Sequence, residues 1–300
     1  MSGALWALAA GAGFGVFQSI NRQAVRGMDV YIATFVQLVV SSIVLIVISL
    51  LSADVSLLFR APFLAILNFA IAGFLHFFVG WTFLNASQKR IGAARTSPLI
   101  GTTPLFAAII AGATLSEFPT WLEMLGIGII IFGVYLVSVP TEVPAGEQGS
   151  TKRISVILSS SWLALAAAFC WSLSPIFIRY GLQGLDSPLL GVTVGVTASA
   201  LAYGGVLLWQ HERWLGNPIT GGAWLQKLIA AVLVGLSTWM RWVALDLAPV
   251  AVVLALTMIS TPLVILLSPL ISGKHLERVT ALLWSGTGLI LGGALILVLV

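Results

Sequence analysis

Long apolar segments alternate with short polar ones along the chain, and ten of the apolar segments are long enough to cross a membrane as helices. A helix needs about 20 apolar residues to span roughly 30 Å of hydrocarbon, because its rise is 1.5 Å per residue and its backbone must be hydrogen-bonded internally. The predicted spans cover residues 4–24, 29–51, 61–85, 92–114, 119–139, 161–181, 187–209, 223–243, 247–271 and 279–299. The pattern predicts an all-α integral membrane protein with ten transmembrane helices.

One polar stretch interrupts this pattern near the middle of the chain. Residues 140–155 read PTEVPAGEQGSTKRIS, and their Pro, Gly, Ser, Thr and charged side chains are typical of a solvated linker. We therefore divide the chain into a first five-helix unit over 1–140, a linker over 141–158 and a second five-helix unit over 159–300.

The two units repeat the same sequence pattern. Residues 6–29 match residues 163–186 at a constant offset of 157, and Thr103-Pro104-Leu105 recurs as Thr261-Pro262-Leu263. Because each unit has an odd number of predicted spans, the second must enter the membrane from the opposite side. The sequence thus predicts two inverted repeats, the arrangement with which many secondary transporters expose a central site to either face in turn.

Composition places most of the surface in lipid. The chain is 59% hydrophobic and 8% charged, whereas about a quarter of the residues of a soluble protein are charged. We therefore expect a multi-pass protein of the inner or plasma membrane. The net charge of +4 suits loops that face lipid headgroups and not a nucleic-acid partner. The chain contains one cysteine, Cys170, so it forms no intrachain disulfide or thiolate metal cluster, and we expect no metal or cofactor.

Several motifs resemble the EamA-type members of the drug/metabolite transporter superfamily. They are residues 91–95 (IGAAR), Thr103-Pro104-Leu105 and Ser116-Glu117, with a weaker repeat over 248–262 and at Glu277. The resemblance covers nearly the whole chain and implies two fused five-helix units, a transport function and cytoplasmic termini.

Loop charges give the opposite orientation from this resemblance. If the spans are as predicted, the basic residues beside several connections all lie on one side: Arg26, Lys89, Arg90, Arg213, Lys274 and Arg278. The positive-inside rule makes that side cytoplasmic and leaves both termini outside. The orientation therefore stays open at this stage, as does the oligomeric state.

Polar and aromatic side chains deep in the spans are the candidates for substrate binding. An ionisable group within a span is costly unless it faces a cavity or a partner. His76 could carry a proton or bind substrate, or could be a neutral histidine bonded to a neighbouring helix. Arg95 and Arg241 could hold a carboxylate while indole rings stack on the substrate. The predicted substrate-binding residues are Phe14, Phe17, Gln18, His76, Trp81, Arg95, Thr102, Thr103, Trp171, Ser174, Trp239, Arg241, Ser260 and Thr261.

Three prolines inside predicted spans, Pro104, Pro175 and Pro262, indicate kinked helices around a cavity. Proline lacks the N–H that would bond the carbonyl four residues earlier, and a neighbouring hydroxyl can bond that carbonyl or a ligand. A hydroxyl-bearing residue directly precedes each of the three prolines: Thr103, Ser174 and Thr261.

Other features are more typical of structural roles. Arg22 and Arg179 end their predicted spans, where they are expected to act as anchors that extend toward the headgroups. They lie seven residues before Asp29 and Asp186, a spacing that also permits pairing at opposite interfaces. Glu117 and Glu277 precede predicted spans, where a helix dipole stabilises a carboxylate, and residues 120–123 (TWLE) form a capping-box pattern. Small-xxx-small spacings that favour close helix packing occur at Gly11 and Gly15, Gly191 and Gly195, and Gly288 and Gly292.

These features favour a secondary transporter, specifically an exporter of small organic metabolites such as amino acids or their derivatives, working by alternating access. No Asp or Glu lies near a predicted span centre, so a desolvated organic cation would lack a counter-charge. Neutral, zwitterionic or anionic substrates fit better, and proton coupling is permitted but not required. An intramembrane enzyme is the alternative, although the chain has no HExxH or GxSxG motif and we assign no catalytic residue. A passive channel or a receptor also remains open.

Overall fold

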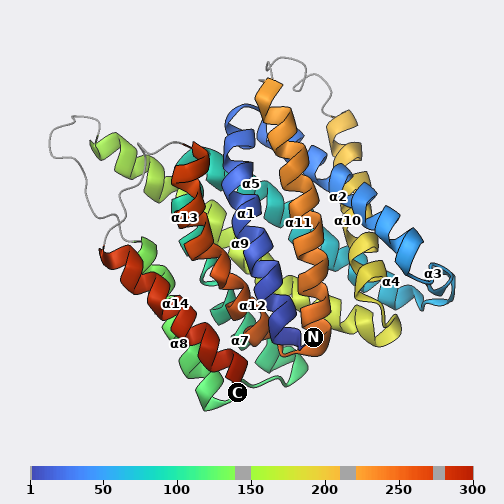
Figure 1. Cartoon of the computed structure of the whole chain (residues 1–300). Helices are drawn as coiled ribbons and strands as arrows, with labels where there is room; N and C mark the ends of the chain where they lie inside the picture. The colour runs from blue at the N-terminus through green and yellow to red at the C-terminus, as the bar shows by residue number, and fades with distance from the viewer. Residues whose placement is uncertain (1, 139–149, 210–220, 273–280, 300) are drawn as a thin grey trace.

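A computed structural model of the chain describes residues 2–138, 150–209, 221–272 and 281–299, and within these ranges it contains helices and turns but no strand. Figure 1 shows the helices gathered side by side into one bundle. In chain order they are α1 (Gly3–Arg26), α2 (Val30–Ser52), α3 (Leu57–Arg60), α4 (Phe63–Gly73), η1 (Phe74–Gly80), α5 (Trp81–Ile91), α6 (Ala93–Ile100), α7 (Thr103–Leu115), α8 (Trp121–Ser138), α9 (Ser150–Gly184), α10 (Pro188–Trp209), α11 (Gly221–Leu247), α12 (Val250–Leu256), η3 (Thr257–Ile259), α13 (Ser260–Ser272) and α14 (Ala281–Leu299).

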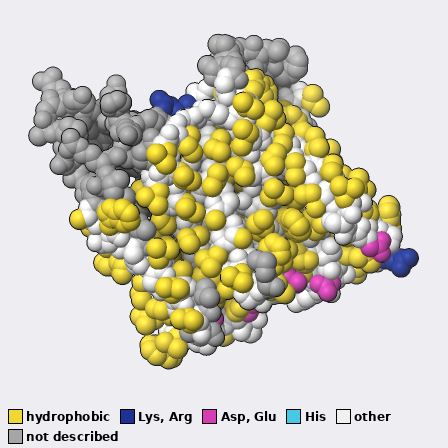
Figure 2. Space-filling view, viewed as in Figure 1, with side chains coloured by type: hydrophobic (Ala, Val, Ile, Leu, Met, Phe, Trp, Pro, Cys, Tyr) yellow, Lys and Arg dark blue, Asp and Glu magenta, His cyan; other side chains and the backbone are white. Residues whose placement is uncertain are grey.

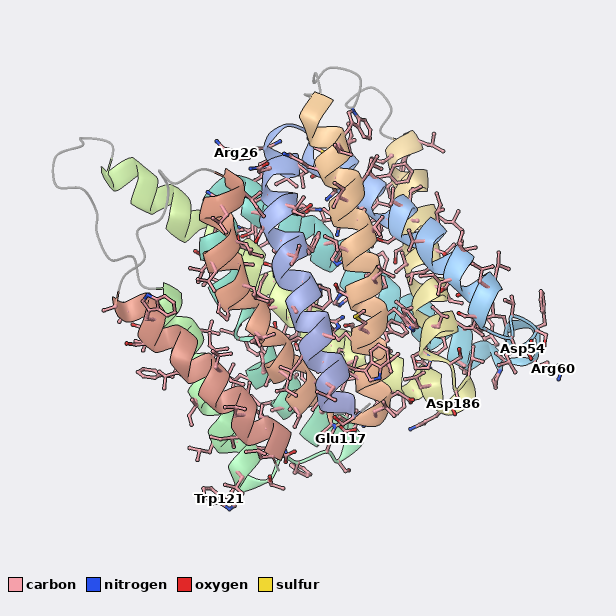
Figure 3. The ribbon with its side chains drawn as sticks, in the orientation of Figure 1. Arg26, Asp54, Arg60, Glu117, Trp121 and Asp186 are labelled. Atoms are coloured by element: carbon pink, nitrogen blue, oxygen red, sulfur yellow. The ribbon has the colours of Figure 1, made fainter. Side chains whose placement is uncertain are left out.

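The described helices have the length and surface of a multi-pass membrane protein. Seven helical stretches of the described residues are long and apolar enough to cross a membrane, two of which, Phe63–Ile91 and Val250–Leu267, run over several consecutive elements. Three further apolar helices are shorter. Hydrophobic side chains cover the face seen in Figure 2, and the few charged ones lie near its ends. The beginning of α1 and the end of α14 lie at the same end of the bundle (Figure 1), which is the end of Glu117 and Asp186 and is opposite to Arg26 (Figure 3).

The fourth predicted span, residues 92–114, is not one continuous helix. It is divided into α6 and α7, and Pro104 lies in the first turn of α7, where its missing N–H costs nothing. The hydroxyls beside the break bond the carbonyls that it exposes. Thr102 Oγ1 donates to the Leu99 carbonyl at 2.8 Å, and Thr103 Oγ1 donates to the Ile100 carbonyl at 2.6 Å.

The ninth predicted span, residues 247–271, is divided in the same way. The 3-10 turn η3 separates α12 from α13, and Pro262 lies in the first turn of α13. The two proline motifs thus act as helix starts after a break and not as kinks within a single helix. Both breaks lie beside the cavity described below, where backbone groups freed from the helical ladder need not face lipid.

Pro175 behaves differently, because α9 continues through it. The carbonyl that this proline deprives of a partner belongs to Trp171, and Ser174 Oγ donates to it at 3.4 Å. The same helix begins at Ser150, so the last residues of the expected linker are helical, while residues 139–149 lie outside the described ranges.

The third span contains an irregularity that the hydrophobic pattern does not reveal. Between α4 and α5 the seven residues of η1 form a π-helical segment, and His76 lies within it. Such segments are rare and are often found at functional sites, since the extra residue turns side chains away from the regular helical stripe.

Close helix packing depends on glycines. An added Cβ at Gly13 of α1 would lie 2.1 Å from Ser237 Oγ of α11, so these two helices approach closely. Helices α8 and α14 run antiparallel: a Cβ at Gly133 would lie 2.7 Å from the Gly286 carbonyl oxygen, and one at Gly293 would lie 2.7 Å from the Gly126 carbonyl oxygen.

The prediction of packing through Gly288 and Gly292 is wrong, because a Cβ at either would meet nothing within 4 Å. Of the other predicted pairs, Gly11 and Gly15 contact η3 and α13, and Gly191 and Gly195 contact α4.

Candidate functional site

A cavity between the two halves of the chain forms the candidate site. It draws its walls from helices of both halves, with α1 and α11 lying along it. The lining residues are Phe14, Phe17, Gln18, His76, Trp81, Leu84, Ile100, Thr103, Trp171, Val234, Arg241, Leu254, Thr257, Met258 and Ser260. The walls are therefore mainly apolar and aromatic, with a few polar groups among them, as is usual for sites that bind small molecules.

Arg241 is a cation in this cavity wall, and His76 is its direct neighbour. Arg241 Nη2 lies 3.1 Å from Nδ1 and 2.9 Å from Nε2 of the histidine, and the guanidinium carbon lies 5.6 Å from the centre of the Phe14 ring. Only 4% of Arg241 and 1% of His76 is exposed. The charge is thus held by an imidazole and an aromatic face, both of which stabilise a guanidinium less than a carboxylate does.

The histidine is fixed from the other side by α9. The ring of Trp171 stacks on the His76 ring with centroids 5.2 Å apart, and Trp171 Nε1 donates to the His76 backbone carbonyl at 3.0 Å. Ser174 Oγ lies 3.2 Å from His76 Nδ1. These contacts join η1 of the first half to α9 of the second half, so the position of the Arg241 and His76 pair depends on both halves.

Most of the predicted substrate-binding residues lie around this one cavity. Those that line it are Phe14, Phe17, Gln18, His76, Trp81, Thr103, Trp171, Arg241 and Ser260. Ser174 lies directly behind His76.

The remaining predicted residues lie elsewhere or are not described. Thr102 bonds the Leu99 carbonyl beside the helix break, and Trp239 faces Trp6 with ring centroids 6.3 Å apart. Thr261 is fully buried and is not among the lining residues. The side chain of Arg95 lies outside what the structure describes. Trp239 therefore packs between helices, and the predicted stacking of this indole on substrate has no support.

Sequence reasoning missed the apolar part of the wall. Leu84, Ile100, Val234, Leu254 and Met258 line the cavity but are common residues in any span, so nothing in their identity marks them. Thr257 could have been found, because it lies in the η3 break close to the predicted motif at Pro262.

Comparison with known proteins places the whole chain in one family. The model of the EamA-like transporter family matches residues 1–139 and 158–299. The chain belongs to the EamA-like transporter family. The resemblance found in the sequence is thereby confirmed, and this EamA-like protein is a member of a family of membrane transporters.

A solved structure supports the same fold for this EamA-like protein. A structure titled "Crystal structure of protein" has a TM-score of 0.74 and 16% sequence identity, with 99% of this chain and 97% of that chain covered. At this identity the likeness shows a shared fold over nearly the full length. No curated protein matches the chain by sequence.

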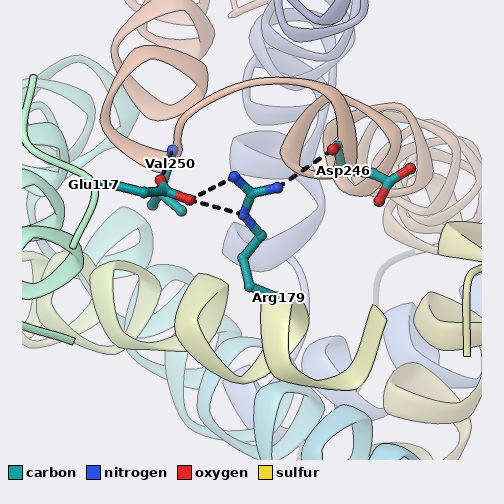
Figure 4. Close-up of polar contacts among 4 residues, drawn as sticks. All are labelled: Glu117, Arg179, Asp246 and Val250. Carbon is teal, nitrogen blue, oxygen red and sulfur yellow. Dashed lines mark hydrogen bonds and ion pairs between the residues drawn. The ribbon is translucent and has the colours of Figure 1, made fainter. Parts of the chain in front are cut away.

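An ion pair joins the two halves of the EamA-like protein near one end of the cavity (Figure 4). Arg179 of α9 donates from Nε (3.1 Å) and Nη2 (2.5 Å) to Glu117 Oε1, and from Nη1 to the Asp246 carbonyl at 3.3 Å. The other Glu117 oxygen accepts the backbone N–H of Val250, which begins α12, at 2.9 Å. We call Glu117, Arg179, Asp246 and Val250 the ion-pair cluster.

The ion-pair cluster corrects two expectations. Arg179 pairs with Glu117 and not with Asp186, and Glu117 stabilises the start of α12 and not that of its neighbour in sequence, α8. The start of α8 has its own cap. Thr120 N–H donates to Glu123 Oε2 at 2.6 Å and Glu123 N–H donates to Thr120 Oγ1 at 3.3 Å, which confirms the capping box. Asp29 likewise caps α2 by accepting the N–H groups of Tyr31 and Ile32, while Glu277 lies outside the described residues.

A second polar cluster, which the sequence analysis missed, lies toward the other end of the cavity. Lys227 of α11 is fully buried, and its Nζ donates to Asn21 Oδ1 at 2.6 Å and to Gln37 Oε1. We use the name lysine cluster for Lys227 and the buried polar side chains connected to it, which are Asn21, Thr34, Gln37, Asn85 and Gln88. A lysine inside a predicted span is the signal that could have found it.

Proposed function

We propose that this EamA-like protein is a secondary transporter of the inner or plasma membrane that exports small organic metabolites carrying a carboxylate, such as amino acids or their derivatives. The proposal has substrate bind in the cavity between the halves, with its carboxylate at Arg241. Aromatic rings of the wall, among them Phe14 and Trp171, then contact the apolar part of the substrate.

The observation that carries this proposal is the state of the Arg241 guanidinium. Its Nε–H is buried and has no hydrogen-bond partner, and no carboxylate among the described residues bonds any of its nitrogens. An unpartnered charged donor costs about 1–3 kcal/mol or more when it is buried. A bound carboxylate would remove this cost and supply the missing counter-charge, whereas an organic cation would add a second positive charge to the wall.

Alternating access is supported by the relation between the two halves. Gly126 corresponds to Gly286 in the repeat, and Gly133 corresponds to Gly293. The contacts of Gly133 with Gly286 and of Gly293 with Gly126 are equivalent, as a two-fold relation between antiparallel α8 and α14 requires. Such a relation favours the inverted repeats that the sequence predicts, and inverted repeats are a common basis of alternating access.

Exchange measurements in proteoliposomes test the proposal. Vesicles loaded with unlabelled L-amino acids should take up a labelled L-amino acid mixture, but not the amines formed by removing the carboxyl group. Arg241→Gln should slow this exchange about tenfold or more, because a charge-assisted hydrogen bond contributes roughly 1.5–3 kcal/mol.

Arg60→Gln is the matched control, because Arg60 is an exposed cation of the short helix α3 outside the cavity. It should exchange amino acids at the parental rate. The proposed substrate class is wrong if Arg241→Gln exchanges as fast as the parent, or if the amines exchange as fast as the acids.

A further inference from the structure

Lys227 is an ionisable group inside the bundle that substrate binding at Arg241 does not use. It is fully buried in α11, and both oxygens that accept from its Nζ belong to neutral amides, those of Asn21 and Gln37. Among the described residues no carboxylate bonds or pairs with it. The ammonium form therefore carries a buried charge without a counter-charge, and the amine form does not.

Among the described residues, the helices that pack around Lys227 supply no carboxylate that bonds it. On the neighbouring helices the described ionisable side chains are cations, phenols and one thiol: Arg22 and Arg26 on α1, Tyr31 on α2, Lys89 and Arg90 on α5, Tyr203 on α10, with Cys170, Arg179 and Tyr180 on α9. The one described carboxylate of α11 itself, Asp246, lies nineteen residues after Lys227, about 28 Å along the helix axis. Asp29 precedes α2, and its carboxylate accepts from the first backbone N–H groups of that helix. Of the described groups, the amides of Asn21 and Gln37 are thus the ones that bear directly on the charge state of Lys227.

The amide of Gln37 is arranged so that it could serve both charge states. Its Oε1 accepts from the ammonium, while its Nε2 is buried and has no hydrogen-bond partner. If Lys227 loses a proton, its nitrogen gains a lone pair that can accept a hydrogen bond. Rotation of the Gln37 amide by half a turn would then present Nε2 as the donor, so the unpartnered donor has a use in the amine state.

The lysine cluster is connected to the substrate cavity. Asn21 Nδ2 donates to Gln88 Oε1 at 2.8 Å, and Gln88 Nε2 lies 3.5 Å from Oε1 of Gln18, which lines the cavity. Lys227 also lies fourteen residues before Arg241 on α11, with the lining residue Val234 midway, so all three share one face of the helix. At 1.5 Å per residue the two cations are about 21 Å apart along the axis, one in the cavity wall and one beyond its end.

We propose that Lys227 is the proton-coupling site of this transporter, which takes up one proton as an ammonium in one orientation of the two halves and releases it as an amine in the other. The inference rests on the proposed transport function and adds the coupling ion to it. Export of substrate then accompanies inward movement of one proton: the ammonium R–NH3+ loses H+ to water on one side, and the resulting R–NH2 takes H+ from water on the other. His76 is less suited to this task, because a second positive charge on it would lie within 2.9 Å of the Arg241 guanidinium.

Transport driven by a pH gradient separates this coupling role from substrate binding. With an acidic lumen, one-to-one exchange and a gradient of about one pH unit, the parent should accumulate the labelled L-amino acid mixture about tenfold. Lys227→Met should abolish the accumulation but exchange labelled for unlabelled amino acids within about twofold of the parental rate, since Arg241 is intact. Lys89→Met, which removes a surface lysine outside the lysine cluster whose Nζ donates to the Met28 carbonyl, should accumulate as the parent does.

Gln37→Glu provides a second variant, which keeps the Lys227 side chain in place and so does not require the fold to tolerate its removal. The change is nearly isosteric and loses no hydrogen bond, because Nε2 of Gln37 makes none. The new carboxylate would hold Lys227 as an ammonium, so this variant should also exchange but not accumulate. Retention of parental accumulation by Lys227→Met or by Gln37→Glu would overturn the proposal.

Nuclear magnetic resonance of the lysine side-chain nitrogens gives an answer that does not require a transported substrate. The chain has four lysines, so a 15N-lysine sample has four such signals, and Lys227→Met identifies the one from Lys227. That signal should change between its ammonium and amine positions within the physiological pH range. A single charge state throughout this range would overturn the coupling role, whereas failure of the parent to exchange amino acids would contradict the proposed function alone.

Discussion

The ion-pair cluster and the lysine cluster both join the two halves of the chain, but they differ in how a charge is compensated. In the first, Arg179 meets a carboxylate, and the two side chains are 24% and 21% exposed. In the second, Lys227 is fully enclosed and meets only neutral amides. Water can replace the partners of a partly exposed pair at small cost, whereas opening an enclosed network leaves buried groups unsatisfied.

This difference suggests different parts in a transport cycle. In the proposed alternating-access cycle, a contact between the halves that separates must be weak enough to break, which suits the ion-pair cluster near the end where Asp246 and Val250 join α11 and α12. The lysine cluster instead has a hydrogen-bond pattern that depends on one proton. Four measurements of stability, from the largest expected effect to the smallest, examine this comparison.

Removal of the Lys227 side chain should have the largest effect. Lys227→Ala leaves Asn21 Oδ1 and Gln37 Oε1 without their donor and opens a gap in the core, so we expect a loss of about 3–5 kcal/mol of unfolding free energy. Unfolding of the purified protein in mixed micelles of increasing SDS fraction measures it. Arg60→Ala, at an exposed position of α3, should stay within about 0.5 kcal/mol of the parent. Equal stability of the two variants would contradict the enclosed network.

Neutralising the ion pair should cost less. Glu117→Gln and Arg179→Gln should each lower the unfolding free energy by about 1–3 kcal/mol, because each weakens charge-assisted bonds between the halves. The double variant should lose less than the sum of the two, by about 1 kcal/mol. Strict additivity in this double-mutant cycle would show that the two side chains contribute independently of each other.

A variant in the capping box of α8 tests whether Glu117→Gln acts through loss of the ion pair or by loosening the loop before that helix. Thr120→Ala removes the hydroxyl that accepts the Glu123 N–H, and loss of such a cap costs about 1 kcal/mol. Since Glu117 bonds α9 and α12 but not α8, the effects of Thr120→Ala and Glu117→Gln should add in the same SDS titration. A strong departure from additivity would mean that Glu117 acts through the α8 loop.

Salt should produce the smallest difference. Raising the ionic strength from about 0.01 M to 1 M shortens the screening length from about 30 Å to about 3 Å, so the partly exposed ion pair should weaken by a few tenths of a kcal/mol. The stability difference between Glu117→Gln and the parent should shrink accordingly, while that between Lys227→Met and the parent should not change. If salt instead reduced the Lys227→Met difference and left the Glu117→Gln difference unchanged, the prediction that the ion pair is the screened contact would be wrong.

Much of the candidate site could be predicted, because the informative residues are rare in spans. His76, Arg241 and Trp171 stand out against an apolar background, and hydroxyl groups beside Pro104 and Pro175 bond the exposed carbonyls as the motif suggests. Residue type alone does not show which helix face a side chain occupies, so the predicted contact of Trp239 with substrate stays a prediction. Trp239 is as prominent in sequence as Trp171, yet it packs against Trp6.

Local spacing in the sequence did not predict which charged side chains pair with each other. Arg179 and Asp186 are seven residues apart, but the arginine bonds Glu117, which lies in the other half of the chain. Lys227 was absent from the expected site although it lies inside a predicted span, because its partners come from α1 and α2. In both cases the contact follows from the packing of distant helices.

The sequence alone determined that this protein lies in a membrane, that its halves are related and that it belongs among EamA-like transporters, because hydrophobic length, repeated motifs and composition are properties of the chain. Only the tertiary structure decided which helices break, which side chains meet in the cavity and which buried cations, Arg241 and Lys227, bond no carboxylate of the described residues. The physical reason is that these depend on the relative rotation and close approach of helices far apart in sequence, which are set by contacts such as Gly13 with Ser237 and not by any local pattern.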